Sequence, residues 1–417
     1  MAFHITNKPF YVKGPMALLM IAGIFFSAAV CHGGTCDGHP SPAVALALNK
    51  ASTALEDNKP EEALALLIKA SKRAGKRSHH LLEFHLGVQL VEAQQPEKAL
   101  THFRRATTLC DTYAPAWQNL GRVAYETQRY SEAADALGQA FFLTEETRPS
   151  LRYFEALARY KEESWESCVS LCLDLFTRFP EIHNVDWIEL ATAAASPAKK
   201  RPEVIDALTS QIARMGEKPR FRRALANLLL QEKRFGEAMV QFRNLDHLGA
   251  LTDGELMTLG DLLRMDKLPL DAARCYHRLA DKGKSSAVLA RKEAETLMAG
   301  FQPQKARDVL ENAVKTWDTP RLWLLTGQLR FEANDFSGAA KAFRQVLTLR
   351  PKHPHALMML GYSLFQQDNP EEALIWLEKA VKLCPKGSAK TLRDYVARHL
   401  DTQKKAKPQA SGDPAGG

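Results

Sequence analysis

The cysteines are the first residues whose type and spacing could support chemistry. Cys168 and Cys172 lie four residues apart, a spacing that brings both thiols to one side of a helix. Two thiols can begin a metal site, but a zinc site needs four ligands, and no neighbouring His or Cys completes the set. We therefore predict that both are buried thiols that act as small apolar side chains.

Two more cysteines, Cys31 and Cys36, lie in the segment CHGGTC near the amino end. Haem attachment is excluded, because it needs two cysteines separated by two residues and followed by His. Cys31 is a candidate for lipidation, since AAVC is similar to a lipoprotein signal, although Val30 is large for such a processing site. The alternatives are a local disulfide between Cys31 and Cys36 in an oxidising compartment, or an unpaired mature terminus.

The histidines and the short catalytic motifs give no support for an enzyme. The 13 histidines are scattered, and the adjacent pair His79 and His80 falls in a turn between repeats. The sequence has no Gly-rich phosphate loop ending in Gly-Lys-Ser/Thr, no His-Glu-x-x-His and no Gly-x-Ser-x-Gly. Without an activating partner or a metal-ligand spacing, no general base can be assigned. We predict no catalytic residue, no metal and no cofactor.

The dominant pattern of the sequence is a pair of small residues twelve positions apart. Gly87 with Ala99 is followed 34 residues later by Gly121 with Ala133. The later pairs are Ala226 with Ala238, Gly260 with Ala272, Ala294 with Ala306, Gly327 with Ala339, and Gly361 with Ala373. Apolar residues recur at three- and four-residue spacing on both sides of a polar break, which predicts two helices per repeat. Gly or Ala at the crossing lets the two backbones approach, and stacking of neighbouring repeats buries the apolar side of each hairpin.

These repeats resemble the tetratricopeptide repeat. The third carries the residues of that pattern: Trp117, Leu120, Gly121, Tyr125, Ala133 and Ala140. The last two carry Trp323, Gly327, Ala339, Phe343 and Pro351, then Leu360, Gly361, Ala373, Ala380 and Pro385. The resemblance covers most of residues 42–386 as ten repeats. It implies an all-α, right-handed superhelical solenoid that serves as a non-enzymatic scaffold for protein binding.

The predicted organisation follows from where the repeat is regular. An N-terminal arc takes residues 42–195 and a C-terminal arc takes residues 217–386. Between them, residues 196–216 form an irregular fifth repeat, where SPAKKRPEV interrupts the place of the hairpin turn and a hinge is predicted. Residues 387–405 read as an amphipathic capping helix, and residues 406–417 as a disordered tail.

Residues 1–31 have the layout of a secretory signal. Lys8 and Lys13 precede an uncharged stretch that ends at Val30 and is followed by small residues. The apolar core begins at Met16 and is about 15 residues long, shorter than the roughly 20 of a spanning helix, so cleavage is favoured over an N-terminal membrane anchor. We predict an exported bacterial protein that is periplasmic or associated with the outer envelope.

The charge of the chain is modestly basic. Lys plus Arg is 56 and Asp plus Glu is 48, which gives a formal net charge of +8. A nucleic-acid binder is expected to carry a denser basic stripe with interleaved aromatics, so nucleic acid is not predicted as a partner. Basic clusters do occur at Lys72–His80, Lys199–Arg201 and Arg220–Arg223. They support an alternative hypothesis, in which basic turns bind an anionic polysaccharide or lipid of the envelope.

A stack of helical hairpins offers a concave groove lined by the first helix of every repeat. Tyr and Arg dominate binding hot spots, so such side chains opposite the packing positions are candidates for holding a peptide or helix of a protein partner. The candidates are Gln118, Arg122, Tyr125, Tyr153, Tyr160, Arg220, Arg223, Asn227, Gln328, Phe331, Met358, Tyr362 and Phe365. Relatives that bind chaperone carboxyl tails use Lys and Asn in this groove, whereas the second repeat has Phe84 and Val88, so that ligand is not predicted. We predict an adaptor in envelope assembly, secretion or polysaccharide export, with an enzyme accessory subunit as a further option.

Overall fold

The computed structural model describes residue 36 and residues 38–182, 184–216 and 218–406. These residues form 21 α-helices and one short 3-10 helix, and none of them lies in a β-strand. The all-α fold is therefore confirmed. The chain divides into two compact units, Met1–Arg234, here the amino-terminal unit, and Phe235–Gly417, the carboxy-terminal unit.

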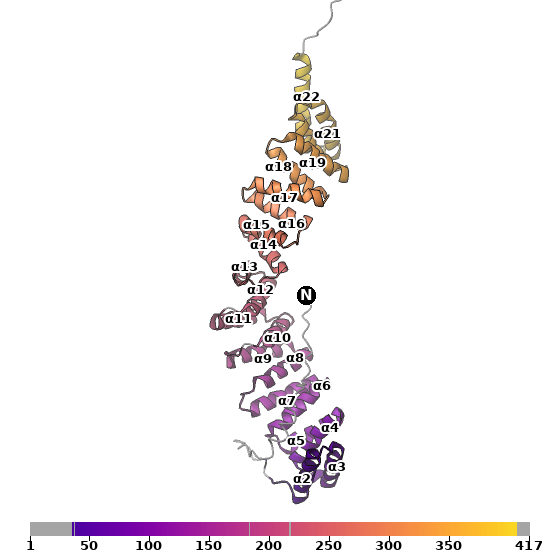
Figure 1. The fold of residues 1–417 in the computed structure, drawn as a ribbon, viewed down its shortest axis with the longest axis vertical. Helices are drawn as coiled ribbons and strands as arrows, with labels where there is room; N and C mark the ends of the chain where they lie inside the picture. The colour runs from indigo at the N-terminus through magenta and orange to yellow at the C-terminus, as the bar shows by residue number, and fades with distance from the viewer. Residues whose placement is uncertain (1–35, 37, 183, 217, 407–417) are drawn as a thin grey trace, which may run out of the picture. The chain divides into compact units, whose positions relative to one another are not determined.

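The amino-terminal unit contains helices α2 to α12 (Figure 1). They are α2 (Pro42–Glu56), α3 (Pro60–Ala74), α4 (His80–Glu92), α5 (Pro96–Leu109), α6 (Ala114–Glu126), α7 (Tyr130–Leu143), α8 (Pro149–Lys161), α9 (Trp165–Arg178), α10 (Val185–Ala195), α11 (Arg201–Met215) and α12 (Pro219–Gln231), with a 3-10 helix at Gly75–Arg77. Within the unit each helix packs against the one before it and the one after it. Each repeat is thus a first and a second helix, beginning with α2 and α3.

The carboxy-terminal unit continues the same alternation. Its helices are α13 (Phe235–His247), α14 (Asp253–Met265), α15 (Pro269–Asp281), α16 (Ala287–Ala299), α17 (Pro303–Thr316), α18 (Pro320–Glu332), α19 (Phe336–Leu349), α20 (Pro354–Phe365), α21 (Pro370–Leu383) and α22 (Ser388–Ala406). Pro351 and Pro385 follow the ends of α19 and α21, as the sequence predicts, because proline cannot continue a helix. Helix α22 packs against α20 and α21, which confirms the predicted capping helix.

The turn inside each repeat uses one residue in the left-handed conformation. In the third repeat Gln128 has a φ of 61°, and its N–H donates to the Tyr125 carbonyl at 3.0 Å. The next residue, Arg129, donates its N–H to the Ala124 carbonyl at 2.8 Å. These bonds satisfy carbonyl groups that the end of a helix would otherwise leave unpaired. The residues with positive φ at this place are Asn58, Gln94, Gln128, Glu163, Lys199, Lys233, Lys267, Phe301, Asn334 and Asp368.

The fifth repeat has the same turn, so the expectation that SPAKKRPEV interrupts it is wrong. Lys199 has a φ of 56°, and Lys200 donates its N–H to the Ala195 carbonyl at 2.9 Å. The repeat instead absorbs additional length before the turn, since 36 residues separate Glu163 from Lys199. Val204 then takes the buried position that Ala or Cys holds in the other repeats.

The boundary between the two units does not coincide with this irregular repeat. It falls between Arg234 and Phe235, in the sixth repeat, rather than within residues 196–216. The hinge at 196–216 and the arcs 42–195 and 217–386 stay predictions.

The glycines of the repeat pattern lie buried where the two helices of a repeat cross, as predicted. A Cβ added at Gly121 would lie 2.6 Å from Leu137 Cγ, too close for real atoms. In the glycine-bearing repeats the obstructing side chain always comes 16 residues after the glycine: Phe103 after Gly87, Leu137 after Gly121, Tyr276 after Gly260, Phe343 after Gly327, and Leu377 after Gly361. A larger side chain at these positions would force the two helices apart.

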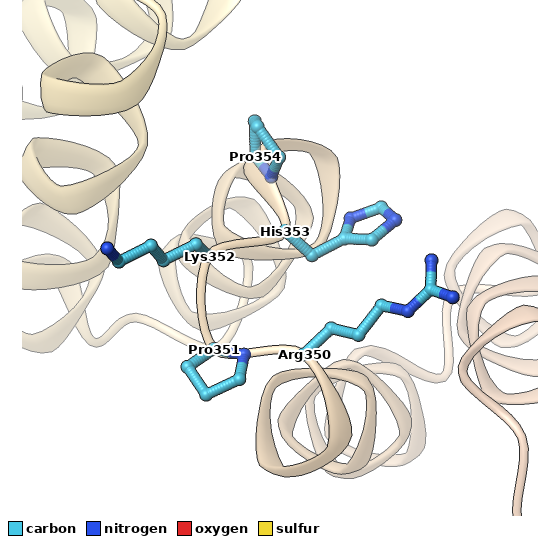
Figure 2. Close-up of a pocket in the computed structure, with 5 residues that line it drawn as sticks. All are labelled: Arg350, Pro351, Lys352, His353 and Pro354. Carbon is cyan, nitrogen blue, oxygen red and sulfur yellow. The ribbon is translucent and has the colours of Figure 1, made fainter.

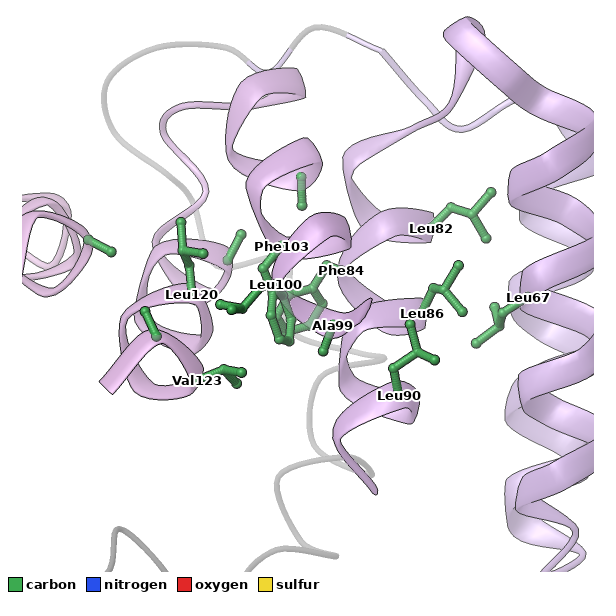
Figure 3. Packing of buried hydrophobic residues seen from close by; sticks show 14 of the residues in the cluster. Leu67, Leu82, Phe84, Leu86, Leu90, Ala99, Leu100, Phe103, Leu120 and Val123 are labelled. Atoms are coloured by element: carbon green, nitrogen blue, oxygen red, sulfur yellow. The ribbon is translucent and has the colours of Figure 1, made fainter. Parts of the chain in front are cut away.

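Figure 3 shows how the first three repeats share one core. Leu67 of α3 points toward Leu86 of α4, and Phe103 of α5 lies beside Leu100 in the layer between α4 and α6. All four side chains are at most 1% exposed. Burying such a side chain stabilises the fold by about 1.5–3 kcal/mol, so each repeat depends on its neighbour for stability.

The buried cysteines behave as the sequence predicts. Cys168 and Cys172 are fully buried on α9. A hydrogen bond with Cys168, together with burial, raises the pKa of Cys172 above its ordinary value. The Cys172 thiol therefore stays protonated, and both buried cysteines serve as packing groups.

A local disulfide between Cys31 and Cys36, one of the alternatives left open by the sequence, is wrong. Cys36 is bonded instead to Cys110, 74 residues away, with a Cα–Cα distance of 5.5 Å. The bond links the segment before α2 covalently to the residue that follows α5. Nearby, His79 Nε2 donates to the Gly38 carbonyl at 2.7 Å. The local spacing of cysteines could not indicate this pairing, which requires the second repeat to be folded. Closing so long a loop stabilises a fold by about 4 kcal/mol in the chain-entropy account.

Several predictions from the termini fall outside the described residues. These are the signal or N-terminal anchor in residues 1–31, lipidation of Cys31, and disorder in the tail after Ala406. Within the part of the chain that the structure describes, no helix combines the length and the apolar character needed to span a bilayer.

Candidate functional site

The thirteen predicted binding residues all lie on first helices. Gln118, Arg122 and Tyr125 are on α6, Tyr153 and Tyr160 on α8, Arg220, Arg223 and Asn227 on α12, Gln328 and Phe331 on α18, and Met358, Tyr362 and Phe365 on α20. None of them is fully buried, and Arg220 is exposed to solvent. We call the surface that these positions define the first-helix face. Binding by these residues stays a prediction.

In the amino-terminal unit, tyrosines of the first-helix face are backed by a second aromatic ring. The ring centroids of Tyr125 and Tyr130 are 5.5 Å apart, and those of Tyr160 and Trp165 are 4.9 Å apart, both with an edge of one ring toward the other. Each pair spans the hairpin turn of its repeat. The ring across the turn therefore helps to fix the orientation of the tyrosine.

Burial of the tyrosine hydroxyls keeps them protonated. It raises the pKa of Tyr125 to about 12. Burial also raises the pKa of Tyr153 well above its ordinary value, and the negative charges of Asp186 and Glu189 add to that effect. At neutral pH both groups are hydrogen-bond donors and acceptors rather than phenolates.

Three polar side chains on consecutive first helices have no hydrogen-bond partner among the described residues: Tyr153 on α8, Thr192 on α10 and Asn227 on α12. Thr192 is 8% exposed, and its Oγ1 is buried and unpaired. An unpaired buried polar group of this kind costs about 1–3 kcal/mol. Thr192 and Asn227 each follow the small packing residue of their repeat, Ala191 and Ala226, so they occupy equivalent places.

The remaining polar members of this face are engaged within the chain or exposed. Arg122 pairs with Glu126 at 3.3 Å, and Gln118 accepts a hydrogen bond from Arg148 at 3.3 Å. Arg220 is exposed to solvent. Exposed pairs of this kind are worth only about 0–1 kcal/mol, so a ligand can displace them at small cost.

In the carboxy-terminal unit, the aromatic side chains of the first-helix face contact one another. The ring of Phe331 lies 4.8 Å from that of Tyr362 and 5.2 Å from that of Phe336, measured between centroids. Phe365 is covered by α22, with ring centroids 5.7 Å from Tyr395 and 5.3 Å from His399. These rings extend the packing between repeats.

The polar candidates of the carboxy-terminal unit are paired as well. Gln328 contacts the His355 ring nitrogen at 3.2 Å across adjacent repeats. The Ser388 hydroxyl of α22 donates to the sulfur of Met358 at 3.1 Å. The sequence correctly places Gln328 and Met358 on first helices, but it could not show that both contact other residues of the chain.

Ion pairs that the sequence reading missed connect the first helices α14, α16 and α18. Lys292 Nζ lies 2.5 and 2.7 Å from the two carboxylate oxygens of Asp261, and the Tyr276 hydroxyl donates to Asp261 at 2.7 Å. Arg321 donates to Glu295 at 2.9 Å. Opposite charges on successive first helices were visible in the sequence. They are equally common on solvated faces, and so they gave no specific signal.

A buried carboxylate in the amino-terminal unit was also missed. Glu83 is fully buried and accepts hydrogen bonds from Ser71 at 3.0 Å, from His102 Nδ1 at 2.7 Å, and from Ser78. Burial alone would raise its pKa, but the bonds from His102, Ser78 and Ser71 outweigh burial and lower it. These partners belong to the first two repeats, so the cluster holds repeats together and is not part of the first-helix face. No group of three His, Cys, Asp or Glu side chains within the described ranges could hold a metal ion.

Comparisons with known proteins agree with the repeat pattern. A family model for the tetratricopeptide repeat matches residues 86–142, 291–345 and 324–388. The DnaJ homolog subfamily C member 7 homolog of Schizosaccharomyces pombe is 25% identical over 204 residues, which are 44% of this chain and 42% of that protein. The chain thus spans less than half the length of this curated relative.

Solved structures with a similar arrangement of helices are known. YrrB, described as a tetratricopeptide-repeat protein with an unusual peptide-binding site, is 20% identical with a TM-score of 0.38, over 48% of this chain and 99% of YrrB. MamA is 17% identical with a TM-score of 0.37, over 48% of this chain and 100% of MamA. These likenesses concern only part of this chain.

Proposed function

We propose, from the premise that this chain carries tetratricopeptide repeats, that it is a non-enzymatic scaffold for protein binding. The partner would be an extended segment that lies on the first-helix face of the amino-terminal unit. The helices concerned are α6, α8, α10 and α12.

The observation that carries this proposal is the unpaired, buried Oγ1 of Thr192 on α10, the first helix that comes between those of Tyr153 and Asn227 in the chain. An extended peptide presents one N–H and one carbonyl per residue, which are the groups that Thr192, Tyr153 and Asn227 can pair with. The rings of Tyr125 and Tyr160 would supply apolar contact beside that row. Binding would thus supply hydrogen bonds that these side chains lack in the unbound protein.

We also propose that the protein works in the bacterial cell envelope after export, in an assembly, secretion or polysaccharide-export system. Support comes from the basic start, apolar stretch and small residues of 1–31. The Cys36–Cys110 disulfide adds to it, because such bonds persist mainly in oxidising compartments. Intact mass and thiol counting of the protein from periplasmic extract test both features, and a full-length, fully reduced chain would contradict them.

Site-specific photo-crosslinking tests the binding face directly. The photoreactive amino acid p-benzoylphenylalanine replaces Tyr153 or Tyr160 in the expressed protein, and cells are irradiated. The matched control places it at Phe142, which is 66% exposed on the second helix α7 of the same unit. We expect one discrete adduct from positions 153 and 160 and none from position 142.

A substitution at Thr192 tests whether the adduct depends on this face. Thr192→Val should reduce the adduct at position 153 because the segment loses a buried hydrogen bond. Equal adducts from positions 142 and 153, or an adduct at 153 that Thr192→Val leaves unchanged, would contradict the proposed face.

A further inference from the structure

A second candidate site lies in the carboxy-terminal unit, away from the first-helix face. It is a pocket of about 640 Å³ formed by the second helices α19 and α21, the loop between α19 and α20, and the start of α20. The lining residues are Arg344, Leu347, Thr348, Pro351, Lys352, Leu357, Trp376, Lys379, Lys382 and Leu383. We call it the basic pocket, because four of these side chains are cationic and none is acidic.

The loop that forms one wall carries more positive charge on its other side. Residues 350–354 line a neighbouring open cavity of about 490 Å³, and Pro351 and Lys352 line both cavities. Figure 2 shows Lys352 extending to the opposite side of the loop from Arg350 and His353. The loop therefore directs a lysine to one side and an arginine with a histidine to the other.

Most of the charge in the basic pocket is not neutralised within the chain. Arg344 pairs with Glu372 at 2.7 Å, and this bond is the main reason that the pKa of Glu372 is lowered. Lys352, Lys379 and Lys382 have no acidic partner among the described residues. Three lysine charges around one pocket repel one another, so an acidic ligand would relieve that repulsion as well as pair with them.

The floor of the pocket is apolar. Leu347 and Leu357 are buried beneath it, and Leu383 is 40% exposed at its rim. The ring of Trp376 lies in the wall, with Lys379 Nζ 4.0 Å from the ring centroid. The indole N–H of Trp376 donates to Glu372 at 3.5 Å, which orients the ring.

We propose that the basic pocket binds an acidic segment of a protein partner that inserts one large apolar side chain against Trp376. The carboxylates would pair with Lys352, Lys379 and Lys382, and the inserted side chain would cover Leu347 and Leu357. An anionic polysaccharide offers the charge but no apolar side chain, so the apolar floor favours a protein segment. This site is formed by second helices and is independent of the binding face proposed for the amino-terminal unit.

A synthetic peptide tests the two requirements separately. The probe is a fluorescein-labelled peptide of six glutamates around a central phenylalanine, and binding to the full chain is followed by fluorescence polarisation. The first control peptide has glycine in place of phenylalanine, and the second has lysines in place of the glutamates. We expect the glycine peptide to bind about tenfold more weakly than the probe, because it loses the buried ring, and the lysine peptide not to bind.

Charge reversal tests the assignment to this pocket. The double variant Lys379→Glu with Lys382→Glu changes two exposed side chains, and it should weaken binding of the probe peptide by at least about tenfold. The matched control is Lys305→Glu with Lys315→Glu on α17, which makes the same change in net charge at two exposed positions of the same unit. Circular dichroism melts check that both variants fold, and the control should bind the probe within about twofold of the wild-type chain.

Three results would overturn the proposal. The glycine peptide could bind as tightly as the probe, which would leave the apolar floor without a role. The two double variants could weaken the probe equally, which would indicate only a general charge effect. Heparin could bind at the same lysines and compete while a Trp376→Leu variant leaves the probe unaffected, which would make the pocket a polyanion site rather than a peptide site.

Discussion

The first-helix faces of the two units carry similar side chains in different surroundings. Tyr160 and Phe365 each follow the small packing residue of their repeat by four positions. Tyr160 contacts only Trp165 of its own repeat in the ring contacts of the described residues, whereas Phe365 is covered by Tyr395 and His399 of α22. Both side chains are partly buried, but the ring at this repeat position packs within its own repeat in one unit and against the capping helix in the other.

This difference teaches that a large residue on the first-helix face is not by itself evidence of binding. In the carboxy-terminal unit the aromatic rings, the ion pair of Asp261 with Lys292 and the contact of Gln328 with His355 connect successive repeats. In the amino-terminal unit α10 keeps an unpaired buried hydroxyl at Thr192, whereas the Arg330 Nε on α18 of the other unit, also without a hydrogen bond, lies 3.9 Å from Asp335. Stability should therefore dominate the role of one face, and recognition the role of the other.

The largest expected effect comes from a feature that the two units share. Gly121→Leu and Gly327→Leu each place a side chain where a Cβ alone would lie 2.6 Å from a neighbour, Leu137 or Phe343. Each should lower the free energy of unfolding by about 3 kcal/mol or more, measured by urea denaturation. Equal melts for wild type and variants would mean that the packing face is assigned wrongly. Gly236→Leu, at a helix position where an added Cβ meets nothing, is the control for the loss of glycine.

Removing one ring from each first-helix face should affect mainly stability in the carboxy-terminal unit and mainly binding in the amino-terminal unit. Phe365→Ala should cost about 2 kcal/mol, because the ring packs between α20 and α22. Tyr160→Ala should cost about 1 kcal/mol or less, and should instead reduce photo-crosslinking from position 153. Denaturation and crosslinking on the same two variants check this. A larger loss of stability from Tyr160→Ala than from Phe365→Ala would reverse the comparison.

A smaller effect is expected from two buried threonines. Thr192→Val removes an unpaired hydroxyl, so the free energy of unfolding should stay the same or rise by up to about 1 kcal/mol. Thr326→Val removes a hydroxyl that donates to the Leu322 carbonyl at 3.0 Å, and should lower it by about 1 kcal/mol. Urea denaturation of both variants distinguishes them. Similar losses would show that the Thr192 hydroxyl is satisfied in solution.

The smallest expected effect is a difference in pH dependence between two buried glutamates. The pKa of Glu83 is lowered, since hydrogen bonds outweigh burial, so its stabilisation is complete above the ordinary pKa of 4.5 and is lost as pH falls through the folded value. Burial raises the pKa of Glu293, although a hydrogen bond from His277 opposes this shift. The stability that the protonated Glu293 contributes is therefore present at low pH and is lost as pH rises through its folded pKa.

Thermal melts of two matched variants check these signs. Glu83→Gln should lower the melting temperature more at pH 7 than at pH 4. Glu293→Gln should be better tolerated at pH 7, because the neutral amide avoids burying a charge. The same pH trend in both variants would contradict the assigned causes.

The sequence predicted the repeat, the buried small residues and the capping helix because each depends on local spacing. Gly121 and Ala133 specify a close crossing by size alone, and Pro351 and Pro385 specify where helices end. The fifth turn was misjudged because SPAKKRPEV lacks the usual residues, although Lys199 adopts the same left-handed conformation as Gln128.

The features that the sequence could not predict require residues from different repeats. The pairing of Cys36 with Cys110 depends on how α5 ends beside the segment before α2. The spacing of Trp376, Lys379 and Lys382 indicates one exposed side of a helix, but the pocket also needs the loop at Pro351. Whether a ring such as Phe365 is covered depends on α22, which lies outside its repeat.

Amide hydrogen exchange with the crosslinked partner tests the central claim most directly. Exchange is compared for the free chain and for the chain saturated with the segment captured at position 153. The account predicts slower exchange in α8, α10 and α12 and unchanged exchange in α18 and α20. Protection confined to α18 and α20, with α8 and α10 unchanged, would contradict it.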